Sequence, residues 1–467
     1  MTAVLAFVGL ALALVAGKIL RRAVSVFRSY FVPSSVLGGL VMLLLGPEVL
    51  GRLVPSLPFG LFSDGMIDVW RQLPGYLINL VFAGLFLGKD LPGLRGIWKL
   101  AGPQAVFGQT IAWGQYVVGI GVTLVLLSPL FGVPHAFGAL LEIGFEGGHG
   151  TAAGLGPTFE AVGWPEGQDL ALAVATVGVI AGVVVGMVLI NWGVRKGATR
   201  FVRSQGSVRT EEENLGHHDD GLDERQSREE PRATISFESI EPLTFHVAYI
   251  GVAIGVGYAL QRALVWLESI TLLRLGVPEL VALIPLFPFA MIGGVIVQVI
   301  HSRLAPTLPL DRELITRVQG VALDFLIVSA VGTLSLGALA DNWAPLLILV
   351  VLGLGWCVLA FMFLAPRMIP DFWFERAIGD LGQSIGMTAT GLLLMRIVDP
   401  HYKSPAFEAF GYKQLLFEPI VGGGVATALS IPVIASFGAV PALIVATVLT
   451  AFWLTMGLLH FGRRRSG

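Results

Sequence analysis

Long apolar segments recur along almost the whole of this 467-residue chain. A helix of about 20 apolar residues is long enough to cross the hydrocarbon core of a bilayer. Charged residues make up only 13% of the chain, whereas a soluble domain carries about 25%. The sequence therefore predicts an all-α polytopic membrane protein. A sliding apolar window places spans at about 3–20, 34–50, 69–88, 102–127, 169–192, 243–262, 279–300, 318–340, 344–365, 414–436 and 440–460.

The stretch 141–164 lies among these spans but differs from them. It is rich in glycine, and its apolar runs are too short to cross a bilayer as an ordinary helix. Glycine lowers helix propensity and lets the backbone approach a ligand closely. Irregular backbone at membrane depth occurs only where protein covers it or where it lines a wet cavity. We therefore predict a re-entrant hairpin over about 136–164. The alternative is an extracellular loop.

The basic residues favour one orientation. Lys and Arg follow every second predicted span, starting with the first, and the alternate loops hold only Arg52, Arg71, Arg262 and Arg274. Cytoplasmic loops carry the excess of Lys and Arg. The N-terminus is thus predicted outside the cell inner (plasma) membrane, and the C-terminus inside. The polar segment 199–240 is predicted to be a disordered cytoplasmic linker. This orientation requires that 141–164 does not cross the membrane.

Two short patterns recur in the same order on either side of the linker. Pro33-Ser-Ser-Val-Leu-Gly-Gly is matched by Pro288-Phe-Ala-Met-Ile-Gly-Gly, and His149-Gly-Thr-Ala-Ala-Gly-Leu by Gly386-Met-Thr-Ala-Thr-Gly-Leu. Five spans in each half give the two halves opposite orientations, which is typical of inverted repeats in secondary transporters. We predict a first membrane repeat at 1–198, a second inverted repeat at 241–438 with a re-entrant hairpin at about 376–399, and an additional C-terminal helix with a basic tail at 439–467.

These residues carry a resemblance to a known family. The run Gly147-Gly-His-Gly-Thr-Ala-Ala, followed by Ala175-Thr-Val-Gly, is similar to the glutamate:sodium symporters. The second half reads Thr388-Ala-Thr-Gly-Leu-Leu-Leu-Met, where Leu394 replaces the family's asparagine. The resemblance implies sodium-coupled symport of a small anionic solute such as glutamate. It also implies a homodimer whose hairpins lie in a mobile domain that moves against a dimerising scaffold.

Ionisable groups at membrane depth are candidates for function because burying them is costly. Glu146 could bind a cation or carry a proton, and His149 could hydrogen-bond the substrate or brace the hairpin. Alternatively, both side chains satisfy each other or nearby backbone. Glu142 and Glu160 are predicted to be solvated near the hairpin ends. The predicted substrate and ion site comprises Glu146, Gly147, Gly148, His149, Gly150, Thr151, Thr176, Gln383, Ser384, Thr388, Thr390 and Arg396.

Hydroxyl oxygens are the kind of ligand that hard cations use. We therefore expect Na⁺ near Thr151 and Thr388, although either hydroxyl could instead bond to its own helix backbone. Arg396 could grip a substrate carboxylate through two parallel hydrogen bonds. The alternative, which we favour, is that Arg396 pairs with Asp399 or extends to the membrane interface.

The predicted function is alternating-access, sodium-coupled transport, with Na⁺ as the coupling ion and no other cofactor. The expected partners are the anionic solute, sodium ions, membrane lipids and a second copy of the chain, with no nucleic acid. The alternatives are a proton-coupled carrier of another organic anion and a channel. No H-E-x-x-H, G-x-S-x-G or P-loop motif suggests an enzyme.

Overall fold

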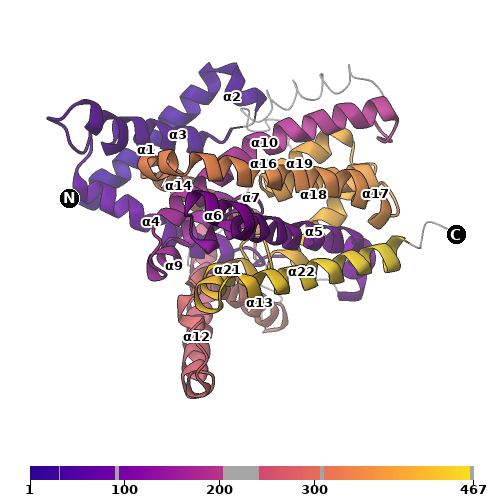
Figure 1. Ribbon diagram of the computed structural model, residues 1–467. Coiled ribbons are helices and arrows are strands. Elements are labelled where there is room, and N and C mark those ends of the chain that lie inside the picture. The colour runs from indigo at the N-terminus through magenta and orange to yellow at the C-terminus, as the bar shows by residue number, and fades with distance from the viewer. Residues whose placement is uncertain (31, 90–93, 203–240, 305–309, 463–467) are drawn as a thin grey trace.

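The computed structural model describes residues 1–30, 32–89, 94–202, 241–304 and 310–462, and the regular elements in these ranges are helices (Figure 1). Most of the predicted linker and the basic tail after Gly462 lie outside the described residues. The first half contains α1 (Thr2–Ala23), α2 (Ser25–Ser29), α3 (Ser34–Leu45), α4 (Asp64–Ala83), α5 (Leu94–Val122), α6 (Ser128–Phe131), α7 (Leu140–Phe145), α8 (Gly148–Gly154), α9 (Gly156–Ala161) and α10 (Glu166–Lys196). The second half contains α12 (Pro242–Ile270), α13 (Leu286–Leu304), α14 (Arg312–Gly332), α15 (Leu336–Asp341), α16 (Trp343–Leu359), α17 (Ala365–Met368), α18 (Trp373–Ile385), α19 (Thr388–Val398), α20 (Ala406–Phe417), α21 (Val425–Phe437) and α22 (Ala439–Met456).

Nine helical segments within the described ranges are long and apolar enough to cross a membrane. They cover nine of the predicted spans and agree with a polytopic membrane protein. The predicted span at 69–88 corresponds to α4, which also carries charged residues in its first two turns. The nine segments are Thr2–Ala23, Ser34–Gly51, Arg95–Phe131, Glu166–Lys196, Pro242–Leu275, Leu286–Leu304, Arg312–Gly332, Trp343–Met368 and Ala439–Phe461.

The predicted span at 414–436 is wrong as a single helix. Helix α20 ends at Phe417 and α21 begins only at Val425. Pro419 has no backbone N–H to donate, and Gly422 and Gly423 have φ angles of +71° and +103°. These angles suit glycine and do not occur in a right-handed helix. An interrupted helix therefore replaces the continuous one, and the segment 418–424 enters the protein interior as irregular backbone.

The helices form two groups that do not follow the order of the chain. A six-helix group combines α1, α3 and α4 with α12, α13 and α14, which pack against one another. A core group combines α5, α7, α8 and α10 with α16, α18, α19, α20, α21 and α22. In Figure 1, α1, α3 and α4 lie on one side, whereas α18 and α19 lie beside α10 and α16 on the other. Each group thus takes helices from both halves.

Glycine allows the same close crossings in both halves of the six-helix group. A methyl group on Gly38 of α3 would lie 2.5 Å from the Ala13 carbonyl oxygen of α1. A methyl group on Gly293 of α13 would lie 2.1 Å from the Ala253 carbonyl oxygen of α12. Only glycine permits such an approach of backbone to backbone. Gly38 and Gly293 are the glycines that the short sequence patterns align with each other.

The neighbouring glycines repeat the correspondence on the next helix. A methyl group on Gly39 would lie 2.6 Å from Val331 Cβ of α14, and one on Gly294 would lie 2.3 Å from the Ala83 carbonyl oxygen of α4. Helix α3 of the first half thus crosses α14 of the second, and α13 of the second half crosses α4 of the first. The aligned patterns therefore make corresponding contacts, with the halves exchanging partners.

Candidate functional site

Two breaks in the core group meet on the same face of α10. The first is the junction of α7 and α8, and the second is the turn between α18 and α19. A methyl group on Gly178 of α10 would lie 2.3 Å from the Ile385 carbonyl oxygen, and one on Gly148 would lie 3.8 Å from the Gly386 carbonyl oxygen. Small residues on α10 thus let both breaks approach the same stretch of helix. The residues predicted from the two patterns are brought together here.

Glu142 on α7 is fully buried and its carboxylate accepts three hydrogen bonds. Tyr116 Oη donates to Oε2 over 2.5 Å, and Thr427 Oγ1 donates to Oε1 over 2.8 Å. The Gly422 N–H donates to Oε1 over 3.1 Å. The prediction of a solvated Glu142 is therefore wrong, whereas Glu160 is exposed as predicted. Glu142 ties α5, α7 and α21 to the irregular segment 418–424.

Glu146 lies one helical turn after Glu142 and is only 4% exposed. Neither of its carboxylate oxygens has a hydrogen-bond partner among the described residues. A methyl group on Gly422 would lie 3.6 Å from Glu146 Cγ, so the segment 418–424 covers this side chain. The Lys413 ammonium is a positive charge that acts on it, but this ammonium bonds directly to Asp380. Burying a carboxylate without a directly bonded partner is costly. The fold thus holds Glu146 where it needs a cation or a proton.

Two buried hydroxyl groups in the same region also lack a hydrogen-bond partner within the described part of the chain. Ser384 Oγ on α18 lies near Glu146, and Thr151 Oγ1 on α8 lies against Gly423. Both side chains are at most 1% exposed. Carboxylate and hydroxyl oxygens suit a hard cation. These oxygens, which have no partner among the described residues, therefore suit a hard cation.

His149 is held in one orientation by Thr176. The Thr176 hydroxyl donates to the Leu172 carbonyl oxygen over 2.9 Å, so its oxygen accepts from His149 Nε2 over 3.0 Å. His149 Nδ1 is then an acceptor, and it has no partner among the described residues. His149 is 1% exposed. The two predicted site residues His149 and Thr176 are thus in contact, and His149 Nδ1 can accept a hydrogen bond in this tautomer.

A buried lysine that the sequence reading missed completes the cluster. Lys413 on α20 is fully buried, and its Nζ donates to Asp380 Oδ1 and to Gln383 Oε1, over 3.0 Å each. Gln414 Nε2 donates to the same Gln383 oxygen over 3.0 Å. The predicted span begins at 414, one residue after Lys413, and no sequence pattern marked this lysine. Its helix begins at Ala406, which places Lys413 two turns inside.

The other predicted residues lie at the two breaks or against a neighbouring helix. Gly150 packs on Ile78 of α4, where a methyl group would lie 3.2 Å from Cδ1. Thr390 is buried beside Gly386, and Thr388 is half-buried at the first turn of α19. Gly147 is half-buried at the junction of α7 and α8.

Arg396 is exposed at the far end of α19. Asp399, its suggested partner, accepts from the Lys403 and Ser404 backbone N–H groups and from Ser404 Oγ. The carboxylate grip by Arg396 stays a prediction. Leu394, which the resemblance aligns with a family asparagine, is fully buried and packs on Gly186 of α10.

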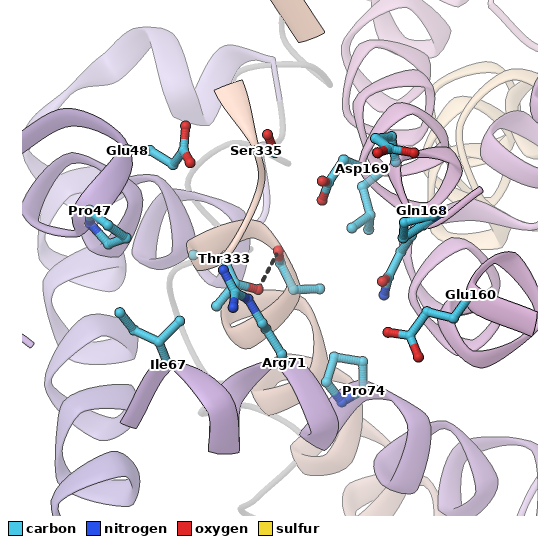
Figure 2. A pocket seen from close by; sticks show the side chains of 15 residues that line it. Pro47, Glu48, Ile67, Arg71, Pro74, Glu160, Gln168, Asp169, Thr333 and Ser335 are labelled. Atoms are coloured by element: carbon cyan, nitrogen blue, oxygen red, sulfur yellow. Dashed lines mark hydrogen bonds between the residues drawn. The ribbon is translucent and has the colours of Figure 1, made fainter. Parts of the chain in front are cut away.

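A cavity of about 340 Å³ lies between the two groups of helices (Figure 2). Arg71 of α4 and Thr333, just after α14, belong to the six-helix side, and Gln168 and Asp169 of α10 belong to the core side. Glu160 lies at the edge near Pro74 in Figure 2. About half of the lining residues are polar or charged, so the cavity can hold water.

The comparison with known families identifies the sequence family of this chain. The family model described as "Sodium/glutamate symporter" matches residues 1–404. The chain belongs to the sodium/glutamate symporter family. The matched residues include both sequence patterns, the junction of α7 and α8, and the turn between α18 and α19. They do not include α20, α21 or α22, so Lys413 and the segment 418–424 lie outside the family match.

Part of this symporter-family chain is similar in sequence to two curated relatives. The "Sodium/glutamate symporter" of Escherichia coli (strain K12) and that of Shigella flexneri are each 28% identical to it over 177 residues. The alignment covers 38% of this chain and 40% of each relative. The chain thus spans about two fifths of the length of the curated relatives that it matches.

Proposed function

We propose that this chain is a sodium-coupled secondary transporter for a small anionic solute, such as glutamate or a related amino or carboxylic acid. The observation that carries the proposal is the buried Glu146 carboxylate, which lies beside the Ser384 hydroxyl and has no hydrogen-bond partner of normal geometry among the described residues. Membership of the sodium/glutamate symporter family supports Na⁺ as the cation. Thr151 and Ser384 would complete its oxygen ligands.

The proposed transport mechanism is alternating access by two inverted repeats. The glycine contacts that correspond between the halves support the repeat, and the basic residues support opposite orientations. In this arrangement, the segments α7–α9 and α18–α19 are re-entrant hairpins that enter from opposite sides. The core group carries them and moves against the six-helix group. The polar cavity between the groups is where such a movement would open a path from outside.

The solute site is proposed beside the first turn of α19. The first backbone N–H groups of a helix have no partner within it and carry partial positive charge. No side chain caps this turn, because the N-cap residue is Met387. A carboxylate of the solute would bind there, next to the half-buried Thr388. His149 Nδ1 would accept a hydrogen bond from an ammonium group, as an amino acid offers.

A homodimer in the cell inner membrane completes the proposal, and it rests on the family resemblance. The N-terminus would be outside, and the linker and C-terminus would be cytoplasmic. The exposed apolar faces of α1, α12 and α22 would contact lipid or the second copy. A carrier of this kind exchanges labelled for unlabelled solute across the membrane. A channel does not, so counterflow in proteoliposomes separates the two.

The substrate is testable on the purified protein. A panel of amino and dicarboxylic acids is added in NaCl or in choline chloride, and thermal unfolding is followed. A ligand at about 100 times its dissociation constant stabilises the native state by about 2.7 kcal/mol. We expect glutamate or a related acid to raise the melting temperature only when Na⁺ is present. A panel without any Na⁺-dependent shift would contradict the proposal.

Proton coupling through Glu146 is the second candidate, because a carboxylate without donors also suits a proton carrier. In this case the acid that binds would raise the melting temperature equally in NaCl and in choline chloride. The stabilisation would instead vary with pH. The comparison of the two salts at several pH values therefore distinguishes the candidates.

A further inference from the structure

The acidic groups of the core outnumber the basic group that faces them. Three fully or nearly fully buried carboxylates, Glu142, Glu146 and Asp380, share this region with one fully buried ammonium, that of Lys413. Arg376 also lies near Asp380, but its guanidinium binds Asp371, Gln104 Oε1 and the Leu100 carbonyl oxygen. Lys413 is therefore the direct counter-charge of Asp380, over 3.0 Å.

The surroundings of the Lys413 ammonium resemble a cation site. It contacts Asp380 Oδ1 and Gln383 Oε1, and its Nζ lies 4.1 Å from the centre of the Phe417 ring. Asp380 Oδ2 is buried and has no hydrogen-bond partner in the described ranges. An ammonium is a compact point charge, close in behaviour to a bound monovalent cation. Oxygen atoms and a ring face thus surround the charge, as they would surround a metal cation.

Helix α5 makes room for the lysine. A methyl group on Gly108 would lie 2.8 Å from Lys413 Cε and 2.9 Å from Nζ. The space for the ammonium therefore depends on a glycine, and the site is shaped around the side chain. Both Gly108 and Lys413 are parts of the core group that also holds Glu146.

We propose that Lys413 is a tethered cation that occupies a second monovalent-cation site, formed by Asp380 and Gln383, beside the exchangeable site at Glu146. The proposal rests on the sodium-coupled function proposed above. The ammonium cannot leave, so it balances Asp380 when the carrier is loaded and when it is empty. Transport then requires a mobile cation only at the Glu146 site.

A tethered cation differs from a purely structural ion pair because free Na⁺ can replace it when it is removed. Lys413→Ala leaves Asp380 and Gln383 with oxygen atoms and the space that the ammonium filled. A free Na⁺ can enter this space, so the variant needs one more Na⁺ than the unmodified protein. Lys413→Arg keeps a tethered charge and does not create this need. Lys403→Ala, which removes an exposed lysine, is the matched control.

The test compares the melting temperature of each purified full-length variant in rising NaCl, with choline chloride keeping the ionic strength constant. We expect Lys413→Ala to be destabilised in choline and restored by Na⁺, with a steeper Na⁺ dependence than the unmodified protein. The Hill coefficient of Na⁺-dependent uptake in proteoliposomes should also rise, by at most one for one additional Na⁺. Lys413→Arg and Lys403→Ala keep the original slope.

A double variant in which both charges are neutralised provides an independent test. Asp380→Asn/Lys413→Gln removes both charges, so its Na⁺ slope should return to that of the unmodified protein. An unchanged slope in Lys413→Ala would overturn the proposal. So would failure to recover Lys413→Ala in high NaCl, because Na⁺ would then not replace the ammonium. Failure of the proposed function looks different, because the unmodified protein would itself show no Na⁺ dependence.

Discussion

At the scale of the residue, two glutamates one turn apart have opposite environments. Glu142 accepts three hydrogen bonds, whereas Glu146 accepts none among the described residues. Sequence reading identified Glu146 but assigned Glu142 to solvent, because Glu142 was placed at the end of a hairpin. Spacing of four residues on a helix puts both side chains on one face. The donors to Glu142 come from α5, α21 and the segment 418–424, which no local pattern brings together.

This contrast predicts different effects of the same substitution. Glu142→Gln replaces an acceptor oxygen by an amide NH₂ group that faces donors, which we expect to cost about 1–3 kcal/mol of unfolding free energy. Glu146→Gln loses no hydrogen bond and should unfold near the normal temperature, but without stabilisation by Na⁺. Thermal unfolding in detergent, with and without NaCl, measures both. Equal destabilisation of the two variants, or a normal response of Glu146→Gln to Na⁺, would contradict this account.

Among the helices, α10 is the element against which both breaks pack. Gly178 and Gly186 were recognised in the sequence as glycines of a spanning helix, but their neighbours were not predictable. Gly178 lies against the Ile385 backbone, and Gly186 against the Leu394 side chain. Leu394, which the resemblance aligns with a family asparagine, fills space between α10 and α19. The resemblance implies the loss of a polar side chain at position 394, whereas the apolar contact with α10 is visible only in the structure.

Gly178→Ala tests the packing on α10. The added methyl group would lie 2.3 Å from a backbone oxygen, which cannot move aside as a side chain can. Overpacking of this kind costs about 1–3 kcal/mol, so we expect a lower melting temperature and slower uptake. Gly251→Ala on α12, where no atom lies within 4 Å, is the control and should change neither. A normal Gly178→Ala protein would refute the close approach.

At the scale of the whole molecule, the sequence predicted the class of fold and most of the spans. Runs of apolar residues mark the spans because the thickness of the bilayer sets the length of a spanning helix. The sequence did not predict the break in the span at 414–436, where Lys413 and the segment 418–424 contribute to the cluster. Apolar composition averaged over a window hides a short interruption. The exchange of helices between the halves was equally invisible, since it depends on contacts across the linker.

The orientation of the two hairpins is testable by labelling. In a Cys357→Ser background, single cysteines replace the exposed residues Ala161 and His401. An impermeant thiol reagent should label Ala161→Cys in intact cells and should reach His401→Cys only after permeabilisation, because the basic residues predict that the loop at 401 lies inside. Labelling of both cysteines in intact cells would exclude opposite entry of the hairpins.

Uptake driven by a sodium gradient is the most direct test of the central claim. The purified protein is reconstituted in liposomes, and labelled glutamate, or the acid found in the stability screen, is added under an inward Na⁺ gradient. A parallel sample has choline chloride and an inward proton gradient. The account predicts accumulation only with the Na⁺ gradient and its loss in Glu146→Gln. Equal accumulation in choline, or normal Na⁺-driven accumulation by Glu146→Gln, would contradict it.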